Sequence, residues 1–78
     1  MPEGVDTWQF LATAKLREGD LDRAEEYQMK YLASAAAPEP MDWVFLGDIF
    51  TARGKAQDAA QAYQRSLHLM KKQIGSKL

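Results

Sequence analysis

The sequence predicts an all-α fold, and three observations carry that prediction. Apolar residues recur at helical spacing in four segments, no segment alternates like a strand, and the chain repeats itself once at a spacing of 35 residues. A period of about 34 residues is typical of repeats built from two helices. Six identities define the repeat: Trp8 with Trp43, Phe10 with Phe45, Leu11 with Leu46, Gly19 with Gly54, Ala24 with Ala59, and Leu32 with Leu67.

The first unit is predicted to contain two helices joined by a short turn. The first runs from Thr7 to Glu18, with Asp6 as its N-cap, and Gly19 ends it because glycine tolerates a positive φ. The second runs from Leu21 to Ala35, with Asp20 as its N-cap. A short turn of this kind makes the two helices antiparallel neighbours.

The second unit repeats this plan after a break at residues 36–40. Pro38 and Pro40 cannot continue the preceding helix. The third helix is predicted from Asp42 to Arg53, with Gly54 ending it, and the fourth from Ala56 to Gln73. The fourth helix is therefore the longest of the four.

Small residues and tryptophans are expected to set the packing of each pair. Close approach of two helices requires small side chains at the crossing, and Ala12 with Ala24, and Gly47 with Ala59, are suited to it. Trp8 and Trp43 begin the two units as large wedges that we expect to be packed away from water.

Bulk composition excludes several classes of function. The 78 residues make one small domain or a piece of a larger protein, with a formal net charge of -1 and no cysteine. We expect no nucleic-acid partner, because there is no basic excess, and no membrane insertion, because no run of about 18 apolar residues occurs. The start of the chain does not read as a signal peptide, which favours the cytoplasm without identifying the compartment.

Catalytic and metal-binding chemistry is not expected. His68 is the single histidine and has no cysteine or second histidine as a co-ligand, so a surface or partly packed histidine is the simpler interpretation. No serine lies in a nucleophile motif, and there is no phosphate loop or dinucleotide fingerprint. The sequence predicts a protein that is not an enzyme and has no catalytic residue, metal, cofactor or small-molecule substrate.

The spaced residues resemble the tetratricopeptide repeat family. The second unit carries nearly the whole signature, whereas the first departs from it at Lys15 and Gln28, where aromatic residues are usual. The resemblance implies one domain over residues 1–78, with repeats at about 5–38 and 40–74, coiled as a short right-handed α-solenoid. The matching residues of the second unit are Trp43, Leu46, Gly47, Phe50, Gly54, Ala59 and Tyr63.

The resemblance also implies a function, the binding of a partner protein or peptide of unknown identity in a concave groove. The family's concave positions correspond to Gln9, Thr13, Leu16, Arg17, Met41, Val44, Asp48 and Thr51, with Asp6 and Ala52 at their margins. The alternative is that these are simply the solvated side of two helices. The family's clamp for C-terminal carboxylates is not expected, since Gln9 and Thr13 replace its lysine and asparagine and Asp48 repels a carboxylate.

The end of the stack suggests a second function, structural self-assembly. Two repeats leave one face uncovered, which Tyr63, Leu67, Met70 and Ile74 are predicted to line, so either a longer array or a homo-oligomer covers it. Charge is also uneven, since no acid follows Asp58. Attraction between copies is one interpretation of that asymmetry, and compensation of a helix dipole by C-terminal lysines is the simpler one.

Overall fold

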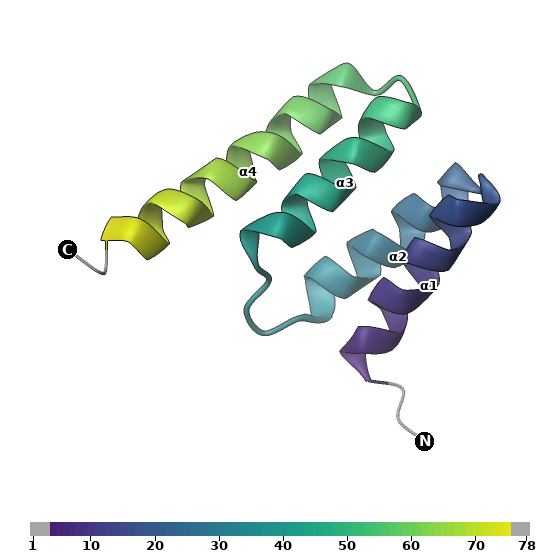
Figure 1. Cartoon of the computed structure of the whole chain (residues 1–78), viewed down its shortest axis with the longest axis horizontal. Helices are drawn as coiled ribbons and strands as arrows, with labels where there is room; N and C mark the ends of the chain where they lie inside the picture. Colours follow the sequence, from purple (N-terminus) through teal and green to yellow (C-terminus); the bar gives the residue numbers. More distant parts are fainter. Residues whose placement is uncertain (1–3, 76–78) are drawn as a thin grey trace. The chain divides into compact units, whose positions relative to one another are not determined.

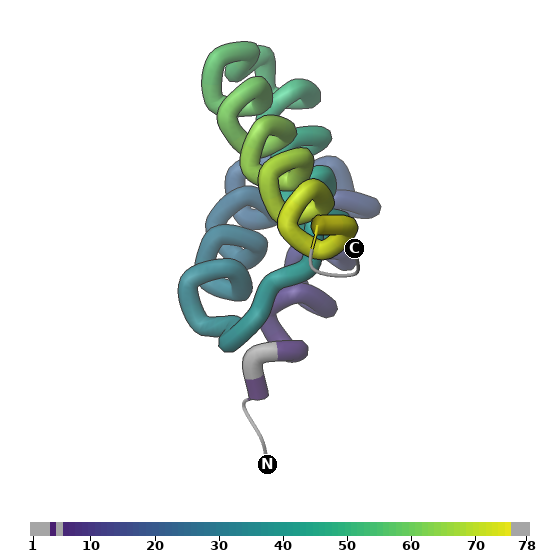
Figure 2. Tube along the Cα trace, turned by 90° about the vertical axis from the view of Figure 1, so that its left-hand side faces the viewer, coloured from purple at the N-terminus to yellow at the C-terminus, as the bar shows by residue number. Residues whose placement is uncertain are grey.

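The computed structural model describes residues 4–75, so the basic Lys77 lies outside the described part. The described residues form four α-helices and no strand, which confirms the all-α prediction (Figure 1). Two compact units divide the chain, Met1–Ala37 and Pro38–Leu78, and each is an antiparallel helical hairpin (Figures 1 and 2). The helices are α1 (Val5–Glu18), α2 (Leu21–Ser34), α3 (Pro40–Ala52) and α4 (Ala56–Gly75).

Both hairpin turns are closed by the same glycine cap. Gly19 has a φ of 84° and Gly54 a φ of 77°, the left-handed region that costs other residues about 1–2 kcal/mol. The next amide then bonds back across the turn, from Asp20 to the Lys15 carbonyl at 2.9 Å and from Lys55 to the Phe50 carbonyl at 2.8 Å. The spacing of 35 residues thus extends to the backbone hydrogen bonds, and the predicted role of both glycines is confirmed.

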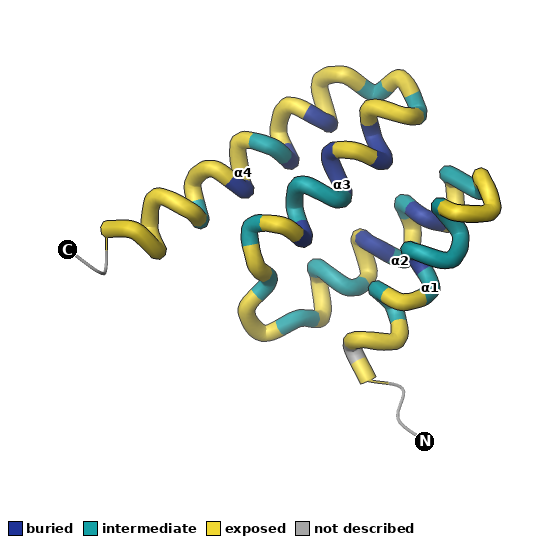
Figure 3. The backbone as a smooth tube through the Cα atoms, viewed as in Figure 1, coloured by how far each residue is buried: buried dark blue, intermediate teal, exposed yellow. Residues whose placement is uncertain are grey.

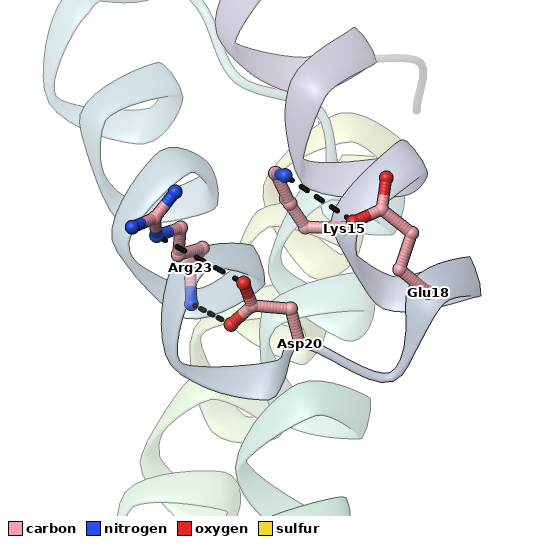
Figure 4. A network of polar contacts seen from close by, with 4 residues as sticks. All are labelled: Lys15, Glu18, Asp20 and Arg23. Carbon is pink, nitrogen blue, oxygen red and sulfur yellow. Dashed lines mark hydrogen bonds and ion pairs between the residues drawn. The ribbon is translucent and has the colours of Figure 1, made fainter.

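Side chains reinforce the turn of the first unit (Figure 4). The backbone amide of Arg23 donates to Oδ1 of Asp20 at 3.2 Å, which confirms Asp20 as the N-cap of α2. The Arg23 guanidinium lies 3.9 Å from the other oxygen of the same carboxylate. Lys15 forms an ion pair with Glu18 at 3.2 Å at the end of α1. Lys15 occupies the position that corresponds to Phe50 in the second unit.

The predicted helix starts need two corrections. Helix α1 begins at Val5, two residues before the predicted Thr7, and its N-cap is Gly4, so the assignment of Asp6 as N-cap was wrong. Asp6 lies inside the first turn, where the helix dipole stabilises a carboxylate. Helix α3 begins at Pro40, two residues before the predicted start, because proline fits the first helical position. Asp42 instead caps this helix from within, and its Oδ2 accepts the Glu39 amide at 2.8 Å.

The helix ends lie close to their predicted positions. Helix α2 ends at Ser34 and α3 at Ala52, each one residue earlier than predicted, whereas α4 runs two residues further, to Gly75. With 20 residues against 13 in α3, helix α4 is the extended one, and its last turns pass beyond the start of α3 (Figure 1).

Each hairpin has its own buried residues, and the second has more (Figure 3). In the first unit Ala12, Ala24 and Gln28 are inaccessible to solvent. The core of the second unit is larger and more apolar, with Leu46, Ile49, Phe50, Ala59 and Ala62 buried. The four predicted small residues at the crossings are all buried, whereas Trp8 and Trp43 are only half-buried.

The crossings of the two hairpins use different pairs of residues. In the second unit the ring of Tyr63 lies so close to Gly47 that an added Cβ would stand 2.5 Å from Cε1 of that ring. At the equivalent positions the first unit has Ala12 and Gln28, both fully buried. Compared with the second unit, the first has a larger residue on its first helix (Ala12 for Gly47) and a less bulky one on its second (Gln28 for Tyr63). This exchange of volume is consistent with the absence of the usual aromatic residue from the first unit.

Candidate functional site

Both tryptophans are covered by a cation from the neighbouring helix of the same hairpin. Lys30 Nζ lies 4.7 Å from the ring centroid of Trp8, and the guanidinium of Arg65 lies 5.2 Å from that of Trp43. Trp8 also stacks on Tyr27, at a centroid distance of 5.7 Å. The two basic residues are themselves 35 positions apart, a signal in the sequence that the list of identities missed because lysine and arginine differ.

The predicted contact residues of the first unit lie along α1. Gln9, Thr13 and Leu16 are half-buried and Arg17 is exposed. The hydroxyl of Thr13 donates to the Gln9 carbonyl at 3.1 Å, so it is used within the helix. Among the described residues of this unit Phe10 is the most exposed large apolar side chain, at 74%, and sequence reasoning did not select it.

The predicted contact residues of the second unit lie along α3 and are more open to solvent. Met41 is 68% exposed, Val44 is half-buried, and Asp48 and Thr51 are exposed. Their spacing of three, four and three residues places them on one side of the helix. This face therefore combines apolar side chains at its N-terminal end with polar groups at its C-terminal end.

A polar cluster joins residues that the sequence assigned to two different surfaces. The phenol of Tyr63 on α4 donates to Oδ1 of Asp48 at 2.6 Å and lies 3.3 Å from Oγ1 of Thr51. Oγ1 of Thr51 in turn donates to the Gly47 carbonyl at 2.9 Å. The hydrogen bond to Asp48 raises the pKa of Tyr63 above its ordinary value of 10.0, and the bond with Thr51 opposes that shift.

A surface pocket of about 290 Å³ adjoins this cluster. It lies where α3 ends and α4 begins, and its walls carry mainly methyl groups and one aromatic ring. Thr51, Gly54, Ala56, Ala59, Ala60 and Tyr63 line it. The pocket is shallow and apolar, and so suits an apolar side chain better than a polar substrate.

The residues predicted for the uncovered face continue from the pocket along α4. Tyr63 is half-buried, and beyond it Leu67, Met70 and Ile74 are 53%, 38% and 61% exposed. In the described chain these three side chains thus form an apolar surface on α4. Asp48, Thr51 and Tyr63 are the predicted site residues that the structure brings together in space.

Groups with catalytic potential lie apart from this surface or are used within the helices. His68 is exposed on α4, and the hydroxyl of Ser66 is buried and donates to the Tyr63 carbonyl at 2.7 Å. Among residues 4–75 no three His, Cys, Asp or Glu side chains gather as a metal ion would require. Within the same range no helix is both long and apolar enough to cross a bilayer. A comparison with protein-family models, with curated proteins and with solved structures finds no match to this chain.

Proposed function

We propose that this chain is a protein-interaction module of the tetratricopeptide type, an adaptor or scaffold that holds a partner peptide or helix. The observation that supports this most directly is the face of α3, where Met41 is 68% exposed and the half-buried Val44 lies beside it. Apolar side chains exposed on a rigid helix favour the docking of another polypeptide. The repeated turn caps and the repeated tryptophan–cation pairs support two copies of one structural unit.

The polar end of the α3 face defines what the partner offers. The carboxylate of Asp48 already accepts from Tyr63, and its position disfavours an acidic group on a bound peptide. The proposed ligand is therefore an apolar segment without a carboxylate at this end. Binding of an acidic C-terminal peptide with micromolar affinity would contradict this part of the proposal.

The test is capture of a binding partner by the intact chain, compared between matched variants. Met41→Glu and Val44→Glu place a charge on the proposed face, and Met29→Glu makes the same change at an exposed position of α2. We expect the first two to lose the captured protein, as read by mass spectrometry, and the third to retain it. Equal capture by all three variants would remove α3 from the binding site.

Self-association is a second candidate function, and a separate observation favours it. Leu67, Met70 and Ile74 expose an apolar surface on α4. A mass that rises with protein concentration, and falls when this surface is charged, would distinguish assembly from the capture of a different protein.

A further inference from the structure

One stripe of α4 is left open to solvent along the whole helix. Its members are spaced by alternating steps of four and three residues, which keeps them on one side of the helix. The residues that α4 buries against α3, such as Ala59 and Ser66, lie about 60–80° around the helix from the centre of this stripe. The open stripe, all of it exposed except the half-buried Tyr63, consists of Ala56, Ala60, Tyr63, Leu67, Met70 and Ile74.

Side-chain size along the open stripe is graded from small to large. Alanines occupy its first two positions, and Met70 and Ile74 its last two. The spacing is also symmetric about position 65, because residues 56 and 74, 60 and 70, and 63 and 67 are equidistant from it. An antiparallel copy of the same helix would therefore set Ile74 opposite Ala56 and Met70 opposite Ala60, as close packing of two helices favours, with Tyr63 opposite Leu67 at the centre.

We propose that two copies of this chain pair through α4, antiparallel, with a two-fold axis near position 65 and the open stripe as the contact. The contact is isologous, so the same six residues serve both sides and the assembly closes at two copies. This pairing presupposes the self-association candidate above and specifies its partner, direction and register.

The pocket described above is the receiving half of this contact. It lies at the alanine end of the stripe, between Thr51 and Tyr63. The last turns of α4 extend past the start of α3 (Figure 1), and Met70 and Ile74 on these turns are 38% and 61% exposed. In the antiparallel register the last turns of α4 in one copy lie over the pocket of the other. Each copy thereby covers the exposed apolar surface of its partner.

Charge along α4 favours the same direction. Lys71 and Lys72 lie near its C-terminal end, Asp58 lies in its first turn, and no acid follows Asp58. Parallel pairing would gather the lysines of both copies at one end, whereas antiparallel pairing puts them at the end where the other copy has Asp58 and opposes the helix dipoles. Asp58 and Lys72 lie on the side of α4 away from the stripe, so this preference comes from the long-range field and not from a direct ion pair. The flank beside the stripe carries uncharged Gln57, Gln61 and Gln64, so it brings no like charges into contact.

Tyr63 gives the contact a rigid centre. Its ring lies against Gly47 and its hydroxyl is held by Asp48, so the side chain that would meet Leu67 of the second copy loses little freedom on pairing. A contact built from one helix per copy is nevertheless small, and interfaces below about 1,200 Å² are typical of weak complexes. We therefore expect a reversible dimer whose mass doubles over the micromolar to millimolar range.

Cysteine cross-linking tests direction and register, and the chain has no native cysteine to interfere. Ala60→Cys and Met70→Cys would be prepared separately and mixed under mild oxidation. The antiparallel register places residue 60 of one copy beside residue 70 of the other, and separates like from like by about 15 Å along the helix axis. We expect the mixed disulfide to exceed both like-with-like products several-fold. Like-with-like products in equal or greater yield would overturn the antiparallel pairing.

Sedimentation of charged variants tests the surface itself. Leu67→Glu places a charge in the centre of the stripe, and Gln61→Glu adds the same charge on an exposed position outside it. We expect Leu67→Glu to remain monomeric at concentrations where Gln61→Glu and the parent chain form dimers, with equal helicity by circular dichroism. A parent chain that stays monomeric at millimolar concentration would overturn self-association altogether. A mass that grows beyond two copies, or grows without the mixed disulfide, would leave self-association standing and overturn this pairing alone.

Discussion

Position 47 requires glycine, because the ring of Tyr63 occupies the space that the Cβ of any other residue would need. Three ring atoms would lie within 2.8 Å of that atom, and the ring is tied to Asp48 by its hydroxyl. For Gly47→Ala we expect a net loss of about 1 kcal/mol of unfolding free energy, since overpacking costs about 1–3 kcal/mol and alanine regains about 1 kcal/mol of helix propensity. Thermal or urea denaturation measures this loss.

Two further variants separate the clash from other effects of the substitution. Gly75→Ala has no atom within 4 Å of the new Cβ and should be neutral or slightly stabilising. Tyr63→Gln copies the partner that Ala12 has in the first unit, so the double variant with Gly47→Ala should be more stable than the sum of the two single changes predicts. Strict additivity would show that the ring and the Cβ do not compete for space.

The phenol of Tyr63 provides a prediction about pH. Ionisation would place two negative oxygens 2.6 Å apart, so the hydrogen bond to Asp48 raises the pKa of Tyr63 in the folded chain. The stability linked to this group is fully present below the ordinary value of 10.0 and is lost as the pH rises through the higher folded value.

Tyrosinate absorbance reads this shift directly. We expect Asp48→Asn to move the titration of Tyr63 to lower pH, with Tyr63→Phe identifying its share of the signal from the three tyrosines. An unchanged titration in Asp48→Asn would mean that the hydrogen bond is not formed in solution.

Two residue-level features were beyond sequence reasoning for a physical reason. The spacing of 35 residues between Lys30 and Arg65 marks them as equivalent positions, but the contact of Lys30 with Trp8 depends on which way a long flexible side chain turns, and helical spacing does not determine that direction. Gln28 is fully buried although it is polar, and its burial arises from the packing of α2 against α1, which the sequence pattern does not describe. Both become visible only when the two helices are placed together.

At the scale of elements, caps were predictable where one residue type suffices. Gly19 and Gly54 were assigned correctly because few other residues adopt their φ, and Asp20 because its side chain reaches the third helical amide. The start of α3 was misplaced because Pro40 was treated only as a helix breaker, although it begins a helix well. Asp6 was misassigned because an acid in the first turn resembles a cap in sequence.

The cap of α2 gives an element-scale prediction. Asp20→Ala removes the acceptor of the Arg23 amide and should lower the unfolding free energy by about 1 kcal/mol, whereas Asp20→Asn retains a cap and should cost much less. Chemical denaturation of the three chains measures the order. An asparagine variant as unstable as the alanine variant would indicate that the ion pair with Arg23, rather than the cap, carries the effect.

At the scale of the whole molecule, the sequence predicted helix number, order and lengths, and an apolar surface on the last helix. It assigned Asp48 and Tyr63 to different surfaces because helical spacing describes one element at a time, whereas their hydrogen bond joins two. The pocket was missed for the same reason, since its walls come from α3, the turn and α4. Sequence spacing does not predict which side chains of two paired helices contact each other.

The unequal cores of the two units predict unequal protection from hydrogen exchange. The second unit buries Leu46, Ile49 and Phe50, each worth about 1.5–3 kcal/mol, whereas the first buries two alanines and Gln28. We expect the amides of α3 and α4 to exchange more slowly than those of α1 and α2, as read by mass spectrometry of peptides. The same comparison in Leu67→Glu at low concentration removes any protection that pairing of α4 would add. Equal protection of both hairpins in that variant would mean that they unfold together, and that local core size does not determine which part of the chain opens first.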